Sequence, residues 1–521
     1  MLRWLDTEGD PVLQVNRMDC EVAHALSPGN LVWAEPSCPY GVDMTAYWAY
    51  EYPLDRVVSR LKRSYVAARE VGTSFMPTLG MGSCPNLRAN VPGCEGKVVL
   101  SHTYEEMLMK TYAVMGVTRA NAMSYFDLCG WSEGEKYADK PVAGKAYAEK
   151  GVGHRFGEKM RKDLLPAFML LQDMDTYDSP NVAVVLSETT GHTSGILWTY
   201  RGYVFDITRI LFDVIPECTI LSDNTLKNAS KYRHIFLPSS SSIIRENYNS
   251  IMKAAKSGSK IYTDFLCRQE YPNATRFDDG KPKTNYYNNY NALLAQMGPS
   301  FERLRGLAED IRREGRANSP AYVEETDGVL RIYPRISEGK VNTFLCLNDT
   351  RTPGPFSTYR PEAKDYMPYG KKCSSIVSLK VDNGSAIYDF MTSKKLPYEY
   401  RDGRAFLKLD VDAAEAAILC VYPSELKTLT GEFKKTSDPR AGVLRIELRD
   451  TDGNLPKGRQ LVNVAISDEK GVRDESKAYK LINGVCEVPV IIPVGGENVS
   501  LTADIVERTS GLKATCKGNM K

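Results

Sequence analysis

The sequence lacks long apolar runs and lacks an excess of charge of either sign. None of its apolar stretches approaches the roughly 20 residues that a membrane-spanning helix needs. The 67 basic residues are balanced by 65 acidic ones, which leaves a formal net charge of +2. Because a balanced chain has no general attraction for polyanions, we expect neither nucleic acid nor a membrane surface as a partner. A neutral or small polar substrate fits this balance better.

Motifs for metals, nucleotides and export are also missing. The 12 cysteines form no CxxC pair, and neither GxGxxG nor GxxxxGK[ST] follows a predicted strand. Cys38, Cys84, Cys94 and Cys129 follow predicted strand ends, but at irregular spacing, so we predict no metal site and no cofactor. Cys84 and Cys94 bracket a loop rich in Pro, Gly and Asn, where a disulfide and two free thiols are both compatible with the sequence. The first 15 residues do not have the segments of a secretory signal, so they give no argument for export.

The length predicts three to five domains, because a single core stops growing near about 250 to 300 residues. In residues 1–175 short β-rich runs alternate with amphipathic helical stretches, which is typical of parallel βα units. The predicted strands are 12–16, 30–36, 73–80 and 120–128, and the predicted helices are 54–72, 104–117 and 155–174. A (β/α)8 barrel needs eight strands and about 250 residues. We therefore interpret this region as the second half of such a barrel, in a chain that would be a fragment of a larger enzyme.

The next region, residues 176–317, is predicted to be a doubly wound, flavodoxin-like α/β domain. Its continuous apolar runs read as strands covered by helices on both faces. The predicted strands are 181–188, 218–223, 234–242 and 260–266, and the predicted helices are 200–214 and 248–258. The stretch from 270 to 300 is rich in Asn, Tyr and Asp and is predicted to be a long surface loop.

Two β domains are expected after residue 317. Alternating apolar and polar residues in 318–428 predict a β-sandwich. A second set of alternating runs in 429–521, with turns at Asp452-Gly453 and Asn483-Gly484, predicts a separate immunoglobulin-like sandwich. The overall fold class is thus multidomain α/β plus all-β.

This order of domains resembles the family 42 β-galactosidases and their relatives. The most specific segment is YRHIFLPSSSSIIRENYNSIMKAAKSGSKIYTDF at 232–265, which is similar to the middle domain of those enzymes. Residues 410–423 look like the last strand of β domains appended to glycosidases, and residues 453–471 are similar to bacterial immunoglobulin-like modules. The resemblance implies hydrolysis of β-galactosides or related saccharides, a middle domain of the glutamine-amidotransferase type without its nucleophile, and a homotrimer. It is compatible with a secreted or periplasmic location.

Two acidic residues are predicted to be catalytic. Glycoside hydrolysis uses a pair of carboxylates, which in a barrel follow the carboxyl ends of strands. Glu35 directly follows an apolar run, and Asp127 follows the run SYF. Alternatively, Glu35 caps a turn or pairs with an arginine, and Asp127 fixes a loop. Aromatic rings near carboxylates suit a sugar, which has an apolar face, so the predicted substrate-binding residues are Trp33, Tyr40, Tyr125, Trp131 and His102. A lone histidine at a helix start, such as His102, is more often a helix cap or a surface residue.

The sequence departs from the related enzymes in one respect. The run TSFMPTLG at 73–80 ends without a carboxylate, whereas the resemblance implies a nucleophilic Glu on the seventh barrel strand. The sequence therefore leaves two hypotheses open, a glycoside hydrolase and a non-catalytic carbohydrate-binding or assembly protein. Amidotransferase chemistry is disfavoured, because all five histidines precede Cys267 and no Cys-His pair in the order of that family is present.

Overall fold

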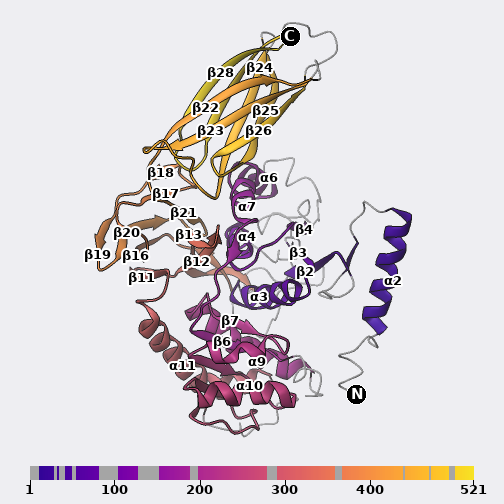
Figure 1. The fold of residues 1–521 in the computed structure, drawn as a ribbon. Coiled ribbons are helices and arrows are strands. Elements are labelled where there is room, and N and C mark those ends of the chain that lie inside the picture. Colours follow the sequence, from indigo (N-terminus) through magenta and orange to yellow (C-terminus); the bar gives the residue numbers. More distant parts are fainter. Residues whose placement is uncertain are drawn as a thin grey trace.

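The computed structural model describes residues 11–27, 32–34, 42–49, 54–80, 104–126, 152–187, 197–278, 290–357, 366–437, 441–468, 471–491 and 499–520. Figure 1 shows helix α2 beside a small parallel sheet, a second α/β layer at one end of the molecule, and β sheets at the other. Among these residues no helix is both long and apolar enough to cross a bilayer.

The first sheet is parallel and has the order β1-β2-β3-β4. Its strands are β1 (Trp33–Ala34), β2 (Met44–Ala49), β3 (Ser74–Gly80) and β4 (Ser124–Phe126). Helices α3 (Leu54–Glu70) and α4 (Tyr104–Val117) occupy predicted positions, and α3 buries Val57, Leu61 and Tyr65 at helical spacing. Strand β2 was not predicted, although its Thr45, Tyr47 and Trp48 favour strands.

The predicted strand at 12–16 is wrong. These residues form the start of helix α2 (Pro11–Leu26). Pro11 stands at the first helical position, where its missing N–H is not needed. Val12 and Val15 suggested a strand, but they lie at the start of 16 helical residues.

The helical stretch expected at 155–174 is present as α6 (Val152–Lys159), the π-helical segment η3 (Met160–Leu164) and α7 (Leu165–Leu171). Pro166 lies at the start of α7. A proline ring clashes with the carbonyl four residues before it, and a wider π turn just before Pro166 relieves that clash.

The second sheet is also parallel, in the order β10-β9-β8-β6-β7. Its strands are β6 (Val182–Val185), β7 (Thr219–Leu221), β8 (His234–Leu237), β9 (Lys260–Thr263) and β10 (Ala274–Arg276). Numbered along the chain this order is 5-4-3-1-2, that of a doubly wound sheet. Helices α9 (Leu197–Val214), α10 (Arg245–Lys256) and α11 (Tyr290–Gly315) surround it, with the 3-10 turn η4 (Leu226–Lys231) between two strands.

The loop predicted from 270 to 300 is wrong at two places. Residues 274–276 form the edge strand β10, and helix α11 begins at Tyr290. The Asn-rich stretch that precedes α11 in the sequence and Pro299 inside the helix hid the helical period, since both residue types disfavour helices. Residues 279–289 lie outside the described part of the chain.

Two facing sheets follow, and they share one apolar core. The four-stranded sheet consists of β11 (Ala321–Thr326), β16 (Cys373–Leu379), β20 (Arg404–Val411) and β19 (Glu399–Arg401), in that order. The six-stranded sheet consists of β18 (Lys394–Lys395), β17 (Ala386–Asp389), β21 (Ala416–Tyr422), β13 (Lys340–Asn348), β12 (Leu330–Ser337) and β5 (Asp175–Thr176). A separate hairpin joins β14 (Arg351–Ser357) to β15 (Tyr366–Gly370). Strand β5 comes from the end of the first region, so backbone hydrogen bonds tie that region to the sandwich.

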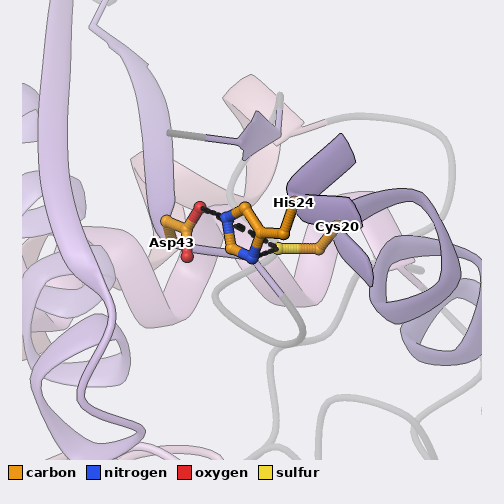
Figure 2. A group of neighbouring side chains, drawn as sticks. All are labelled: Cys20, His24 and Asp43. Carbon is orange, nitrogen blue, oxygen red and sulfur yellow. Dashed lines mark hydrogen bonds and ion pairs between the residues drawn. The ribbon is translucent and has the colours of Figure 1, made fainter. Parts of the chain in front are cut away.

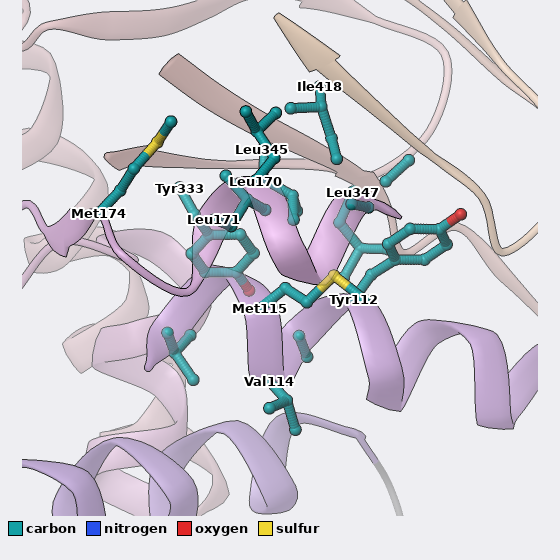
Figure 3. Close-up of a cluster of buried hydrophobic side chains, with 14 of the residues drawn as sticks. Tyr112, Val114, Met115, Leu170, Leu171, Met174, Tyr333, Leu345, Leu347 and Ile418 are labelled. Carbon is teal, nitrogen blue, oxygen red and sulfur yellow. The ribbon is translucent and has the colours of Figure 1, made fainter. Parts of the chain in front are cut away.

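The outer face of the six-stranded sheet packs on helices α4 and α7. Figure 3 shows Tyr112 and Met115 of α4 and Leu171 of α7 lying against side chains of the sheet. The sheet contributes the buried residues Tyr333, Leu345, Leu347 and Ile418. Burial of large apolar side chains contributes about 1.5 to 3 kcal/mol each, so this joint is part of the core.

The last seven strands form one hydrogen-bonded sheet, in place of the two sheets of the expected immunoglobulin-like sandwich. In sheet order they are β22 (Leu426–Lys435), β23 (Ala441–Asp450), β26 (Val485–Ile491), β25 (Gly471–Ile482), β24 (Arg459–Asp468), β27 (Val499–Glu507) and β28 (Lys513–Met520). The two edge strands approach each other, because a Cβ atom added to Gly518 of β28 would lie 2.6 Å from Phe433 of β22. The sheet is therefore curled until it nearly closes.

Candidate functional site

The predicted catalytic carboxylates adjoin strand ends of the first sheet. Strand β1 ends at Ala34 and strand β4 ends at Phe126, directly before Glu35 and Asp127 in the sequence. Because the sheet is parallel, both strands end at the same edge, which we call the carboxyl edge. Glu35 and Asp127 themselves lie outside the described residues, as do Tyr40, His102, Trp131 and the side chain of Trp33.

The two strand ends are well separated. Strands β1 and β4 are the outer strands of the sheet, with β2 and β3 between them. Three strand spacings amount to about 14 Å along the sheet. The two carboxyl groups of a glycosidase lie about 5 to 9.5 Å apart. Two carboxylates that follow β1 and β4 must therefore extend toward each other across the carboxyl edge to reach the separation of a glycosidase pair.

Tyr125 is the one predicted substrate-binding residue whose side chain is described. Its ring packs edge-on against Phe156, with ring centroids 5.4 Å apart. Its hydroxyl lies 3.2 Å from the hydroxyl of Thr111 and donates to the sulfur of Met123 at 2.9 Å. Burial raises the pKa of this phenol well above its usual value. These contacts explain Tyr125 as a packing residue, and its contact with a substrate stays a prediction.

A second group of reactive side chains lies where α2 meets the first sheet. Figure 2 shows Cys20 and His24 on α2 facing Asp43. Nε2 of His24 lies 2.8 Å from Oδ2 of Asp43, and Sγ of Cys20 lies 3.9 Å from the same oxygen. The sulfur is 4.0 Å from each ring nitrogen of His24. We call these three residues the Cys20–His24–Asp43 group, which in the described part of the chain has the composition and spacing of a metal site.

The sheet holds Asp43 in place. The backbone N–H of Val32 donates to Oδ2 of Asp43 at 2.8 Å, and the backbone N–H of Asp43 donates to the carbonyl of Val32 at 3.0 Å. These residues precede β1 and β2, so the group lies at the amino edge of the sheet, opposite the carboxyl edge. The hydrogen bond from Val32, and then that from His24, lowers the pKa of the Asp43 carboxyl.

The thiol of this group is not activated as a nucleophile. Partial burial, and then the negative charge of Asp43, raises the pKa of Cys20. Reactive cysteines have a lowered pKa because the thiolate is the nucleophile. Sulfur, imidazole nitrogen and carboxylate oxygen are, however, the usual ligands of Zn²⁺. The sequence analysis missed this group because it assigned the start of α2 to a strand, which hid the helical spacing of Cys20 and His24.

A buried carboxylate lies at the carboxyl end of the second sheet. Asp264, directly after β9, accepts hydrogen bonds from the backbone N–H groups of Ser239, Leu266 and Cys267 at 2.5 to 3.0 Å. Burial raises its pKa to about 7 in spite of these donors. Burial also raises the pKa of the neighbouring Cys267 thiol to about 11. This thiol is therefore protonated at neutral pH.

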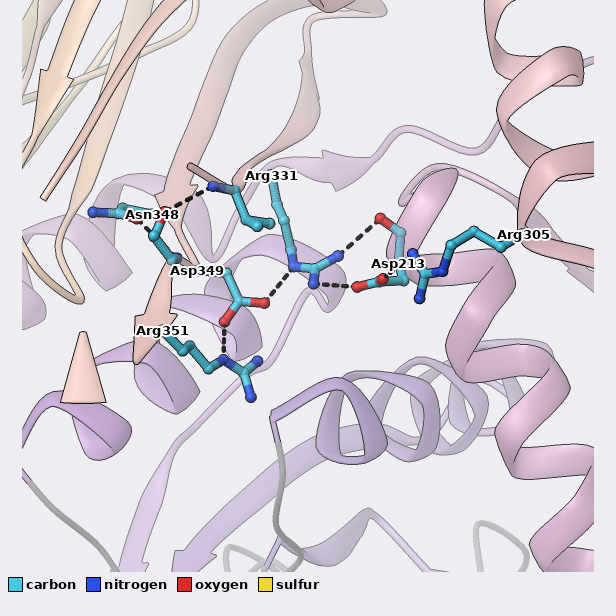
Figure 4. Close-up of polar contacts among 8 residues, drawn as sticks. Asp213, Arg305, Arg331, Asn348, Asp349 and Arg351 are labelled. Atoms are coloured by element: carbon cyan, nitrogen blue, oxygen red, sulfur yellow. Dashed lines mark hydrogen bonds and ion pairs between the residues drawn. The ribbon is translucent and has the colours of Figure 1, made fainter. Parts of the chain in front are cut away.

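Charged residues form a buried network between the second sheet's helices and the sandwich (Figure 4). Arg331 of β12 pairs with Asp213 of α9 and, through Nε at 2.6 Å, with Asp349. Arg305 of α11 lies 2.8 Å from Asp213, and Arg351 lies 2.5 Å from Asp349. Every carboxylate here has arginine partners, so the network serves to join the layers.

Comparisons with known proteins identify the fold. No protein-family model matches the chain, and no curated protein matches it. Among solved structures, α-L-fucosidase isoenzyme 2 from Paenibacillus thiaminolyticus aligns with a TM-score of 0.50 and 10% identity, over 78% of this chain and 70% of that enzyme. A β-galactosidase from Bacillus circulans sp. alkalophilus aligns with a TM-score of 0.48 and 13% identity, over 78% and 66% of the two chains.

Gan42B, a GH42 β-galactosidase from G. stearothermophilus, gives a TM-score of 0.47 and 9% identity, over 78% of this chain and 67% of that enzyme. The chain thus spans about two thirds of the length of these enzymes. At such identities the likeness concerns the fold alone. The alignment with the α-L-fucosidase supports a shared fold, so the expected glycoside-hydrolase fold is confirmed at that level.

Proposed function

We propose that the chain is a glycoside hydrolase acting on β-galactosides or related saccharides, with its site at the carboxyl edge of the β1–β4 sheet. The observation that carries the proposal is the glycoside-hydrolase fold, together with two strands of that sheet that end directly before acidic residues. In this proposal Glu35 and Asp127 act as the carboxylate pair, and Trp33, Tyr40, Tyr125, Trp131 and His102 contact the sugar.

The domain division belongs to the same proposal. Residues 1–175 form part of a (β/α)8 barrel, residues 176–317 a domain of the amidotransferase type, and residues 318–428 and 429–521 two β domains. The parallel β1–β4 sheet and the doubly wound order of the second sheet support the first two assignments. A homotrimer formed through the middle domain is proposed on the resemblance alone.

A non-catalytic carbohydrate-binding role is the second candidate. Strand β3 ends at Gly80 and is followed in the sequence by Met81 and Gly82, so it brings no carboxylate to the carboxyl edge. A barrel remnant with one strand-end acid on each outer strand suits sugar binding as well as hydrolysis. Turnover and binding must therefore be measured separately.

The test is to assay the full chain on a panel of nitrophenyl glycosides that includes β-D-galactoside and α-L-fucoside. We expect Glu35→Gln and Asp127→Asn each to lower kcat by at least a hundredfold, since each removes one member of an essential pair. Glu399→Gln, an exposed acid on β19, is the matched control. Equal activity in Glu35→Gln and the unmodified chain would overturn the role of Glu35, and saccharide binding by calorimetry without any turnover would favour the second candidate.

A further inference from the structure

We propose that the Cys20–His24–Asp43 group binds a divalent transition-metal ion, Zn²⁺ in the first place, and that this ion fastens helix α2 to the amino edge of the first sheet. The inference goes beyond the proposed glycosidase function and does not depend on it. It concerns a structural site, remote from the carboxyl edge.

The positions of the ligands follow from the local structure. Cys20 and His24 are four residues apart on α2, so their side chains lie on the same face of the helix, one turn apart. Pairs with this spacing are a common way for a helix to supply two metal ligands. Asp43 supplies the third ligand from the sheet, and its hydrogen bond from Val32 fixes one carboxylate oxygen at 2.8 Å from that N–H.

The distances are close to those of a tetrahedral site. Zn–S bonds of about 2.3 Å and Zn–N and Zn–O bonds of about 2.0 to 2.2 Å place the ligand atoms about 3.3 to 3.6 Å from one another. The three observed separations are 2.8 Å for N to O, 3.9 Å for S to O and 4.0 Å for S to N. Shifts of about half an ångström in side chains that are only partly buried would bring all three to the tetrahedral values. Water is the usual fourth ligand where a protein supplies three.

A thiol-based catalytic triad fits the same atoms less well. In such a triad the sulfur approaches one imidazole nitrogen while the carboxylate holds the other. Here Sγ of Cys20 is equally far, 4.0 Å, from Nδ1 and Nε2. The group also lies at the amino edge of the sheet, whereas barrel enzymes react at the opposite face. Both observations favour a structural role.

Helix α2 is the element that needs such a connection. Its described residues Met18, Val22 and Leu26 are 63%, 57% and 83% exposed, so this apolar stripe is not buried against the rest of the chain. Within the described residues, the hydrogen bonds that join α2 to other elements are those of Cys20 and His24 with Asp43. A metal ion bound by both elements would replace these contacts with stronger ones.

The test is a titration of the full chain with Co²⁺, followed by competition with Zn²⁺. We expect one ion per chain, a thiolate-to-cobalt charge-transfer band, and loss of that band when Zn²⁺ is added. Cys20→Ser should abolish the band and weaken binding at least tenfold, and Asp43→Asn should weaken binding to a similar extent. The matched control is Cys516→Ser, which removes another half-buried thiol, on β28, and should leave both the band and the affinity unchanged.

Limited proteolysis gives a second readout that does not depend on the spectrum. Zn²⁺ should slow cleavage within α2 severalfold in the unmodified chain and have no effect in His24→Asn. A band that persists in Cys20→Ser would show that other cysteines bind the ion and would overturn the proposal. The absence of any charge-transfer band in the unmodified chain, or equal protection of α2 in His24→Asn, would also overturn it.

Discussion

The guanidinium of Arg335 donates a hydrogen bond to the carbonyl oxygen of Leu171 at 2.9 Å, in a fully buried position. The same group also donates to the carbonyls of Thr118 at 2.7 Å and Met174 at 2.5 Å. One side chain of β12 therefore binds the carboxyl-terminal ends of both α4 and α7, where the helix dipoles favour a positive charge. Burial lowers the pKa of Arg335 to about 10, so the group is still charged at neutral pH.

We expect Arg335→Met to destabilise the chain by about 3 to 5 kcal/mol, because methionine fills part of the volume but leaves buried carbonyls without donors. Arg335→Lys should be milder, since lysine keeps the charge but reaches fewer carbonyls. Chemical denaturation followed by circular dichroism measures both. The exposed Arg401→Met is the control, and a loss for Arg335→Met no larger than for this control would contradict the role of Arg335.

The network around Arg331 predicts a loss of stability in acid. Burial opposes ionisation of Asp213 and Asp349, but the nearby arginines overcome this effect and lower the pKa of both carboxyls below the usual value. A carboxyl with a lowered folded-state pKa stabilises the fold above its unfolded pKa of about 3.9, and this contribution is lost as the pH falls through the folded pKa. We expect the free energy of unfolding to drop below about pH 4, and Asp213→Asn to drop less steeply. Identical slopes for both proteins in urea titrations between pH 5 and pH 3 would contradict this assignment.

The sequence predicted elements best where the hydrophobic period is long or continuous. Helix α3 repeats buried residues every three or four positions, β6 is wholly apolar, and β8 is apolar after His234. Periodicity misleads where local propensity and tertiary context disagree. Strand β2 was missed although Thr45, Tyr47 and Trp48 favour strands, and the start of α2 was taken for a strand because valine favours strands.

The candidate site was harder to predict than the fold, because its residues converge only in three dimensions. Cys20 and His24 share a face only if residues 11–26 are helical, and Asp43 approaches them only because Val32 and Asp43 pair across two strands. The sequence shows these side chains but not the approach of α2 to the sheet. For the carboxyl edge, by contrast, an acid after a strand is a local signal, which is why Glu35 and Asp127 were predicted.

Two buried groups in the second sheet predict opposite pH dependences. Burial, and then the charge of Lys260, lowers the pKa of His234 to about 4. The neutral His234 therefore stabilises the fold fully above its unfolded pKa of about 6.5, and this contribution is lost as the pH falls toward 4. Asp264, with a pKa raised to about 7, stabilises the fold relative to the unfolded chain below about pH 4 and loses this contribution as the pH rises toward 7. Each effect is on the order of 3 to 4 kcal/mol.

Between pH 4 and pH 7 these two effects oppose each other, so the single variants separate them. We expect the stability of Asp264→Asn to rise with pH over this range relative to the unmodified chain, and that of His234→Asn to fall. Urea denaturation at half-unit pH steps measures the slopes, with the exposed Asp504→Asn as control. Slopes that change in the same direction in both variants would contradict the opposing roles.

The curled C-terminal sheet makes a prediction about Gly518, and helix α11 makes the opposite prediction about Gly306. A Cβ atom on Gly518 would lie 2.6 Å from Phe433 across the contact between β28 and β22, so Gly518→Ala must push these strands apart. We expect a destabilisation of about 1 to 3 kcal/mol, the usual effect of overpacking.

Gly306, inside α11, has nothing within 4 Å of an added Cβ. Gly306→Ala should therefore stabilise the chain by about 0.5 to 1 kcal/mol through the better helix propensity of alanine. Thermal unfolding of the two variants checks the contrast, and equal stability of both would show that β22 and β28 do not meet.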